Sequence, residues 1–169
     1  MIINNLDEMK DFAKKFALSL KKNDFINLIG DMGAGKTTFT GFLCENFAIY
    51  DSSSPTFALV NIYEGDILIY HLDLYRLDDP DELMDIDYET YFYPQDAITI
   101  IEWAENAGDF LPDEMINLEI KKLDGDKREV SISNDSIRGR EINEYLGNWY
   151  FNDDFYCDYC KWQWNHWWF

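Results

Sequence analysis

The 169-residue chain is short of cysteine, of basic residues and of long apolar runs. Three cysteines do not make the disulfide framework of a small secreted protein. No apolar run approaches the length of a membrane span, and the amino terminus lacks the basic and then apolar pattern of a secretion signal. We therefore expect a soluble, cytoplasmic protein with no membrane partner.

The shortage of basic residues bears on nucleic acids. Lysine and arginine number 14 against 33 aspartate and glutamate, which leaves a formal net charge of −19. Nucleic-acid binding is dominated by neutralisation of phosphates, so this balance argues against direct, affinity-driving contact with RNA or DNA. Any role that involves RNA is expected to go through a partner. The acidity is equally well explained as a solubility or lineage bias.

The most informative stretch that is present runs from Gly30 to Thr37, Gly-Asp-Met-Gly-Ala-Gly-Lys-Thr. It fits the phosphate-binding pattern G-x-x-x-x-G-K-[ST], and it follows an apolar run of strand character at 25–29. After it, apolar residues recur with helical spacing to Phe47. A strand, a glycine loop and a helix are the context that a P-loop requires.

The loop residues have distinct expected roles. Glycines let the backbone turn tightly, so that its N–H groups can approach phosphate oxygens. Lys36 is predicted to reach the outer phosphates, and Thr37 to place its hydroxyl on Mg²⁺. The sequence thus predicts a nucleotide site whose cradle is Asp31, Met32, Gly33, Ala34 and Gly35.

The rest of the chain alternates helical and strand patterns. An amphipathic helix is expected over 6–20, and two runs at 57–63 and 67–74 predict an antiparallel hairpin. An acidic helical stretch at 79–84 precedes the buried strand at 98–101, and two further strands are expected at 115–120 and 128–132. Cys44, on the helix after the loop, is interpreted as a packing residue.

Two acids and a threonine complete the candidate site. Asp73 and Glu102 each follow a strong strand pattern, and the carboxyl edge of an α/β sheet is where ligands bind. Either acid is a candidate Mg²⁺ ligand, although such acids also serve as turn or cap residues. Thr56 lies in a Ser-Pro-Thr loop downstream of the P-loop helix, in the order of a γ-phosphate-sensing switch, and its alternative is a plain turn. His71 is interpreted as a packed strand residue.

Four motifs in this order resemble the bacterial TsaE family, also called YjeE. They are GDMGAGKTTF at 30–39, SPTF followed by LVNIY at 54–63, YHLDLYRL at 70–77 and IIEWAE at 100–105. The resemblance covers roughly residues 1–133. It implies an α/β, P-loop NTPase-like three-layer sandwich, in which helices flank a mixed, mostly parallel sheet with an antiparallel hairpin.

The resemblance also implies a function. Family members are small Mg²⁺-dependent ATPases that bind TsaD and TsaB and are required for threonylcarbamoylation of adenosine 37 in tRNAs reading ANN codons. Carried over by position, Lys36 and Thr37 bind phosphate and metal, with Thr38 nearby. Asp73 is the metal acid, Glu102 is the residue on which hydrolysis depends, and Thr56 belongs to the switch-like loop. ATP and Mg²⁺ are the implied cofactors.

Two alternatives use the same loop. A small-molecule kinase would need an arginine-bearing lid, and the chain has only Arg76, Arg128, Arg138 and Arg140. A non-catalytic module, in which nucleotide merely orders a surface, would bind without turnover. There is no Asn-Lys-x-Asp stretch of the kind that reads guanine, which favours ATP.

The carboxyl-terminal part departs from the family. We expect a P-loop ATPase domain over 1–146 and an extension over 147–169 in which about half the residues are aromatic. The pair Cys157 and Cys160 has metal-ligand spacing, with His166 as a candidate third ligand. A structural zinc site needs four ligands and no second Cys pair exists. No βαβ pattern supports a redox role for the pair. The favoured interpretation is an aromatic appendage that docks on its own domain, on a second copy or on a partner.

Overall fold

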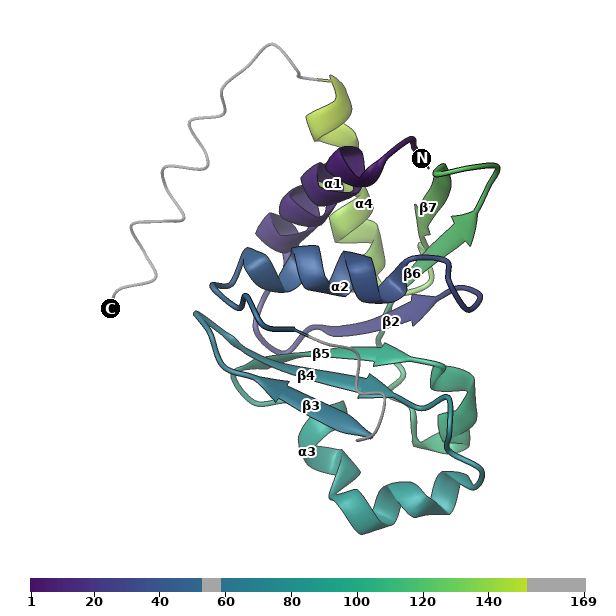
Figure 1. Ribbon diagram of the computed structural model, residues 1–169. Coiled ribbons are helices and arrows are strands. Elements are labelled where there is room, and N and C mark those ends of the chain that lie inside the picture. The colour runs from purple at the N-terminus through teal and green to yellow at the C-terminus, as the bar shows by residue number, and fades with distance from the viewer. Residues whose placement is uncertain (53–58, 152–169) are drawn as a thin grey trace, which may run out of the picture.

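A seven-stranded sheet lies between two layers of helices (Figure 1). The computed structural model describes residues 1–52 and 59–151. The strand order is β1-β7-β6-β2-β5-β4-β3. The strands are β1 (Ile2–Ile3), β2 (Phe25–Ile29), β3 (Val60–Tyr63), β4 (Leu68–Asp73), β5 (Ala97–Glu102), β6 (Ile116–Lys122) and β7 (Arg128–Ile132).

The sheet is mostly parallel. Strands β6, β2, β5 and β4 pair in parallel. At one side of this group β3 pairs antiparallel with β4, and at the other side β7 pairs antiparallel with β6 and with β1. The predicted hairpin is β3 and β4. The expectation of an α/β, P-loop NTPase-like sandwich with a mixed, mostly parallel sheet is confirmed. The short β1 and the pairing of β7 with β6 were not part of the prediction.

Helices cover both faces. Helices α1 (Leu6–Ser19), α2 (Lys36–Glu45) and α4 (Ile137–Phe151) lie over one face (Figure 1). The other face carries the short α3 (Tyr88–Phe92) and the 3-10 segments η1 (Pro80–Ile86) and η2 (Ala104–Phe110). The predicted acidic helix at 79–84 corresponds to η1. A strand sends successive side chains to opposite faces, so the central strands feed two separate cores.

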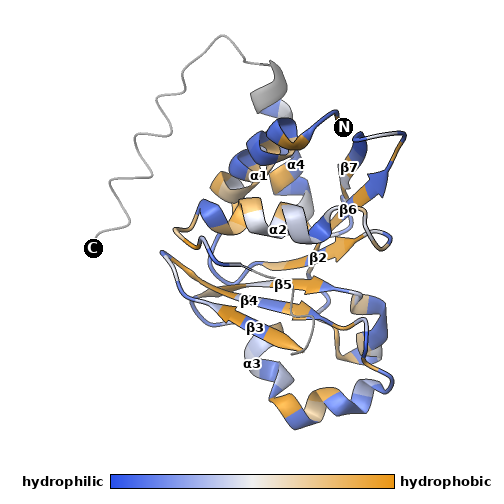
Figure 2. Cartoon of the chain, in the orientation of Figure 1, coloured by the Kyte–Doolittle hydropathy of each residue, from blue (hydrophilic) through white to orange (hydrophobic). Residues whose placement is uncertain are grey.

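The two cores differ in their packing. Under α1 and α2, Phe12, Phe16 and Phe39 form an aromatic cluster with ring centroids 5.7–6.0 Å apart. On the opposite face, Phe25 meets Phe92 edge to face at 5.5 Å. Every position of β5 is buried, as expected of a central parallel strand, and Figure 2 shows the apolar residues concentrated in the strands.

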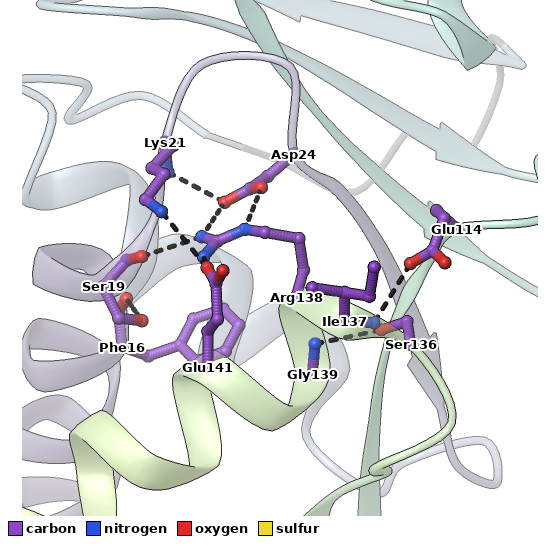
Figure 3. Close-up of polar contacts among 10 residues, drawn as sticks. All are labelled: Phe16, Ser19, Lys21, Asp24, Glu114, Ser136, Ile137, Arg138, Gly139 and Glu141. Atoms are coloured by element: carbon purple, nitrogen blue, oxygen red, sulfur yellow. Dashed lines mark hydrogen bonds and ion pairs between the residues drawn. The ribbon is translucent and has the colours of Figure 1, made fainter.

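Helix α4 was not predicted, and an ion pair fastens it to the turn between α1 and β2 (Figure 3). Arg138 Nε donates to Asp24 Oδ1 at 2.8 Å, and Nη2 donates to Asp24 Oδ2 at 2.7 Å and to the Ser19 carbonyl at 3.0 Å. These bonds to Asp24 raise the pKa of Arg138. The boundary predicted between residues 146 and 147 falls inside α4 and stays a prediction.

Some sequence predictions concern residues beyond this description. Ser54, Pro55 and Thr56, and the tail residues Cys157, Cys160 and His166, lie outside the described residues. Among the residues that the structure does describe, no helix is both long enough and apolar enough to cross a membrane. Cys44 is fully buried, and burial raises the pKa of its thiol to about 12, which fits the predicted packing role.

Candidate nucleotide site

The glycine loop is the turn between β2, which ends at Ile29, and α2, which begins at Lys36. Two of its glycines are required by geometry. A Cβ on Gly30 would lie 2.4 Å from the Ile120 carbonyl oxygen of β6, and Gly35, the N-cap of α2, has a φ of 112°. Gly35 has no side chain to cap the helix, so the first N–H groups of α2 can serve an anion.

Lys36 is buried beside the loop, with 5% of its surface exposed. Its Nζ donates to the carbonyl oxygens of Gly30 at 2.6 Å and Asp31 at 3.4 Å. The same atom lies 3.7 Å from Glu102 Oε2 and 4.6 Å from the centre of the Trp103 ring. A buried ammonium is stable only when it is paired and hydrogen-bonded, and this environment supplies both requirements.

The two acids occupy neighbouring strand ends. Asp73 ends β4 and pairs in register with Glu102, which ends β5 and pairs with Leu28 of β2. Glu102 is buried, with 4% exposed, and Asp73 is half-buried. Because β2 leads directly into the glycine loop, the sheet brings both carboxylates to the edge where the loop lies. Their roles stay predictions.

Trp103 adopts an unusual backbone conformation directly after Glu102. Its φ of 60° lies in the left-handed region, where a bulky aromatic residue is a true outlier. The ring packs against Tyr75 with centroids 5.1 Å apart and lies under the Lys36 ammonium. Strain of this kind costs about 1–3 kcal/mol and gathers at functional sites.

Sequence reasoning missed two polar contacts at this site. His71 is buried as predicted, yet its Nε2 lies 3.1 Å from Glu102 Oε1. Arg128, at the start of β7, donates from Nε to the carbonyl oxygen of Ala34 at 2.6 Å, which braces the loop from outside. Strand position carried a signal for each contact. His71 is two residues before Asp73, so the two share a face of β4. Arg128 begins β7, which runs antiparallel to β6 and so starts near the end of β6.

The remaining predicted residues line the loop and the helix start. Asp31, Met32 and Gly33 are exposed, Ala34 is buried, and Thr37 and Thr38 are exposed in the first turn of α2. Gly33 has no neighbour within 4 Å of a built Cβ, which leaves its backbone accessible to a phosphate. The backbone of the loop is therefore open on this side, and its role as a phosphate cradle stays a prediction.

The donor set also fits magnesium. The Thr37 hydroxyl and the carboxylates of Asp73 and Glu102 are hard oxygen donors, the kind that Mg²⁺ prefers. Among the described residues, no group of three or more histidine, cysteine, aspartate or glutamate side chains is arranged to hold a metal. Mg²⁺ in such sites is normally shared between one or two protein ligands, water and substrate phosphate, so a protein cage is not needed.

A strand, a glycine loop with positive φ angles, a buried lysine and a mostly parallel sheet define this protein as one with the P-loop NTPase fold. Residues 3–130 match the family model described as threonylcarbamoyl adenosine biosynthesis protein TsaE. The chain belongs to the TsaE family.

Individual relatives agree with this assignment. The tRNA threonylcarbamoyladenosine biosynthesis protein TsaE of Rickettsia bellii is 40% identical over 137 residues, which are 79% of this chain and 94% of the relative. The protein of the same name from Bacillus subtilis is 37% identical over 131 residues, covering 76% and 81%. The crystal structure of B. subtilis YdiB matches with a TM-score of 0.73 at 30% identity and covers 88% of this chain and 93% of that one.

Proposed function

We propose that this chain is the Mg²⁺-dependent ATPase subunit that binds TsaD and TsaB and couples ATP hydrolysis to threonylcarbamoylation of adenosine 37 in tRNAs reading ANN codons. Membership of the TsaE family supports the modification pathway. The observation that carries the enzymatic part is the buried pair of Lys36 and Glu102, 3.7 Å apart beside the glycine loop. An NTPase needs a cation for phosphate and an acid for hydrolysis at one place.

Phosphate binding falls to Lys36 and the loop backbone. Lys36 Nζ now bonds neutral carbonyl oxygens of Gly30 and Asp31. A phosphate oxygen is a better acceptor for an ammonium because it is charged, so Lys36 exchanges these carbonyls for the outer phosphates of ATP. The loop N–H groups bind the remaining phosphate oxygens.

Hydrolysis falls to Glu102. When Lys36 turns to the phosphates, the Glu102 carboxylate loses its ionic partner and can orient the attacking water. Thr37 and Asp73 would hold the metal, and Glu102 would be a further oxygen donor to it. Mg²⁺ held there would supply positive charge to offset the charge that develops on the phosphates. Thr56, outside the described residues, keeps its predicted role in sensing the γ-phosphate.

The charge of the chain supports a division of labour with its partners. With a net charge of −19, the chain repels polynucleotide phosphates. TsaD and TsaB therefore hold the tRNA, and this subunit acts on them in the cytoplasm without touching the RNA itself.

The test measures two products for each variant. Purified chain is mixed with TsaD, TsaB, tRNA and the remaining components of the modification reaction, and phosphate release and modified tRNA are quantified. We expect Lys36→Ala and Glu102→Ala each to abolish both products. Asp109→Ala, which removes an exposed acid on η2, is the matched control and should behave as the wild type.

Other outcomes separate the alternatives. Full activity in both Lys36→Ala and Glu102→Ala would overturn the assignment. Transfer of the γ-phosphate to a metabolite in place of water would favour a kinase. Tight ATP binding without turnover, even with both partners present, would favour a non-catalytic module.

A further inference from the structure

A chain of polar side chains crosses the interior from β3 to β5. Asn61 Nδ2 donates to Tyr63 Oη at 3.3 Å, Tyr63 Oη lies 3.3 Å from His71 Nδ1, and His71 Nε2 lies 3.1 Å from Glu102 Oε1. His71 is fully buried, and Tyr63 and Glu102 are 8% and 4% exposed. Polar groups are costly to bury, so a continuous buried chain that ends on a candidate hydrolytic acid calls for an explanation.

Strand geometry explains how these groups meet. Residues two apart on a strand share a face, so His71 lies on the same face of β4 as Asp73. Ile69 on β4 and Ile98 and Ile100 on β5 belong to the core under α1 and α2, which places this face on the side of α2. His71 is directly opposite Ile100 on β5, so its side chain reaches diagonally to Glu102, two residues further along β5 toward the glycine loop.

The contact determines where a proton sits. An ionised carboxylate only accepts hydrogen bonds, so with Glu102 ionised we assign the proton to Nε2 of His71, and this N–H donates a hydrogen bond to Glu102 Oε1. The other ring nitrogen faces Tyr63 Oη, whose ring packs 6.1 Å from the imidazole. The imidazole is therefore held from both sides, and one oxygen of Glu102 is held by it.

We propose that His71 is a positioning residue for Glu102, a role that rests on the function proposed above. Its Nε2–H anchors Oε1, and the other carboxylate oxygen, Oε2, lies 3.7 Å from Lys36 Nζ. When Lys36 leaves for the phosphates, this charge-assisted bond keeps the carboxylate aimed at the nucleotide. Without the hydrogen bond from His71, the Glu102 carboxylate would follow Lys36 or turn toward solvent. ATP hydrolysis would then slow, while ATP binding would be retained.

The test compares three substitutions at one position. The Gln amide N–H can reach the position of Nε2, the shorter Asn amide cannot, and Leu has no donor. For each variant, kcat of partner-stimulated hydrolysis and the Kd for a non-hydrolysable ATP analogue are measured. We expect His71→Leu and His71→Asn to lower kcat about 10-fold or more with Kd little changed, and His71→Gln to recover most of kcat.

Two further results decide the proposal. If His71→Leu does not fold, the Gln and Asn pair carries the test, because both side chains carry an amide and only the Gln amide reaches the position of Nε2. If the wild type hydrolyses ATP and the Gln and Asn variants have equal kcat, the role of His71 is overturned while the proposed function stands. Absence of wild-type turnover would overturn the proposed function and this role together.

Discussion

At the scale of single residues, the candidate nucleotide site holds two arrangements that are costly to form. Trp103 occupies the left-handed region immediately after Glu102, and Lys36 is buried with an acid as its ionic partner. Each of these features costs free energy in the folded state. The surrounding strands β2, β4 and β5 each have a partner strand on both sides, so they can support that cost.

Gly30 tests how closely the loop is fitted to the sheet. Gly30→Ala would place a Cβ 2.4 Å from the Ile120 carbonyl in β6, at a φ of 156°. Strand β6 is paired on both sides and cannot move away, so the loop must move instead. The strain is worth about 1–3 kcal/mol. We therefore expect the Kd for ATP to rise about 10-fold or more. Isothermal titration calorimetry measures this change.

Gly147→Ala is the control for that measurement, because a Cβ there meets nothing within 4 Å. It should bind ATP as the wild type does. Equal affinity in Gly30→Ala would mean that the loop is not held against β6 when nucleotide is bound.

At the scale of elements, what the sequence could predict depended on how local the signal was. Apolar residues dominate β2 (FINLI) and β5 (AITIIE), and the glycine loop has its own motif. Helix α4 escaped because Gly139 and Gly147 interrupt it and both disfavour a helix. The structure shows why Gly139 is there, since a Cβ would lie 2.3 Å from the Ser133 carbonyl.

The contacts of the site were harder to predict than its residues. Lys36, Asp73 and Glu102 each follow a recognisable strand or loop pattern. The bond from His71 to Glu102 joins residues 31 apart, and the bond from Arg128 to Ala34 joins residues 94 apart. Such pairs depend on strand order, and β6 and β4 lie on either side of the β2–β5 pair in a way that no local pattern reveals.

The ion pair of Asp24 and Arg138 is the main polar attachment of α4 to the body. Their side chains are 5% and 21% exposed. Removing one partner leaves a buried charge, so Asp24→Asn and Arg138→Met should each lower the free energy of unfolding by about 3 kcal/mol. The double variant should lose clearly less than the sum, because no uncompensated charge remains. Urea denaturation measures all three.

An exposed ion pair provides the control. Lys22 and Asp96 lie 2.9 Å apart with side chains 45% and 82% exposed, so Lys22→Met should cost less than about 1 kcal/mol. A similar cost for Lys22→Met and Arg138→Met would show that burial at α4 adds nothing to the pair.

At the scale of the whole molecule, α4 decides where the chain can be cut. Ile142 and Leu146 are buried in the core under α1 and α2. A chain ending at Leu146 keeps these contacts and Arg138, so we expect ATP affinity and unfolding midpoint close to those of the full chain. A chain ending at Asp135 loses all three and should unfold at markedly lower temperature. Calorimetry of both truncations checks this expectation.

The same truncation separates the nucleotide site from the aromatic extension at 147–169. Pull-down with TsaD and TsaB, with and without ATP, compares the full chain with the one ending at Leu146. Loss of ATP affinity in the shorter chain would contradict the expectation that residues 1–146 suffice for the nucleotide site. Loss of partner binding alone would assign the extension to docking.

The central claim is that this chain hydrolyses ATP and that Glu102 carries the hydrolysis. The most direct measurement is single-turnover phosphate release in the presence of TsaD, TsaB and Mg²⁺, with ATP binding measured in the same samples, for wild type and Glu102→Gln. We predict that both proteins bind ATP with affinities within about threefold of each other and that only the wild type releases phosphate. Release by Glu102→Gln at the wild-type rate, or no release by the wild type, would contradict the account.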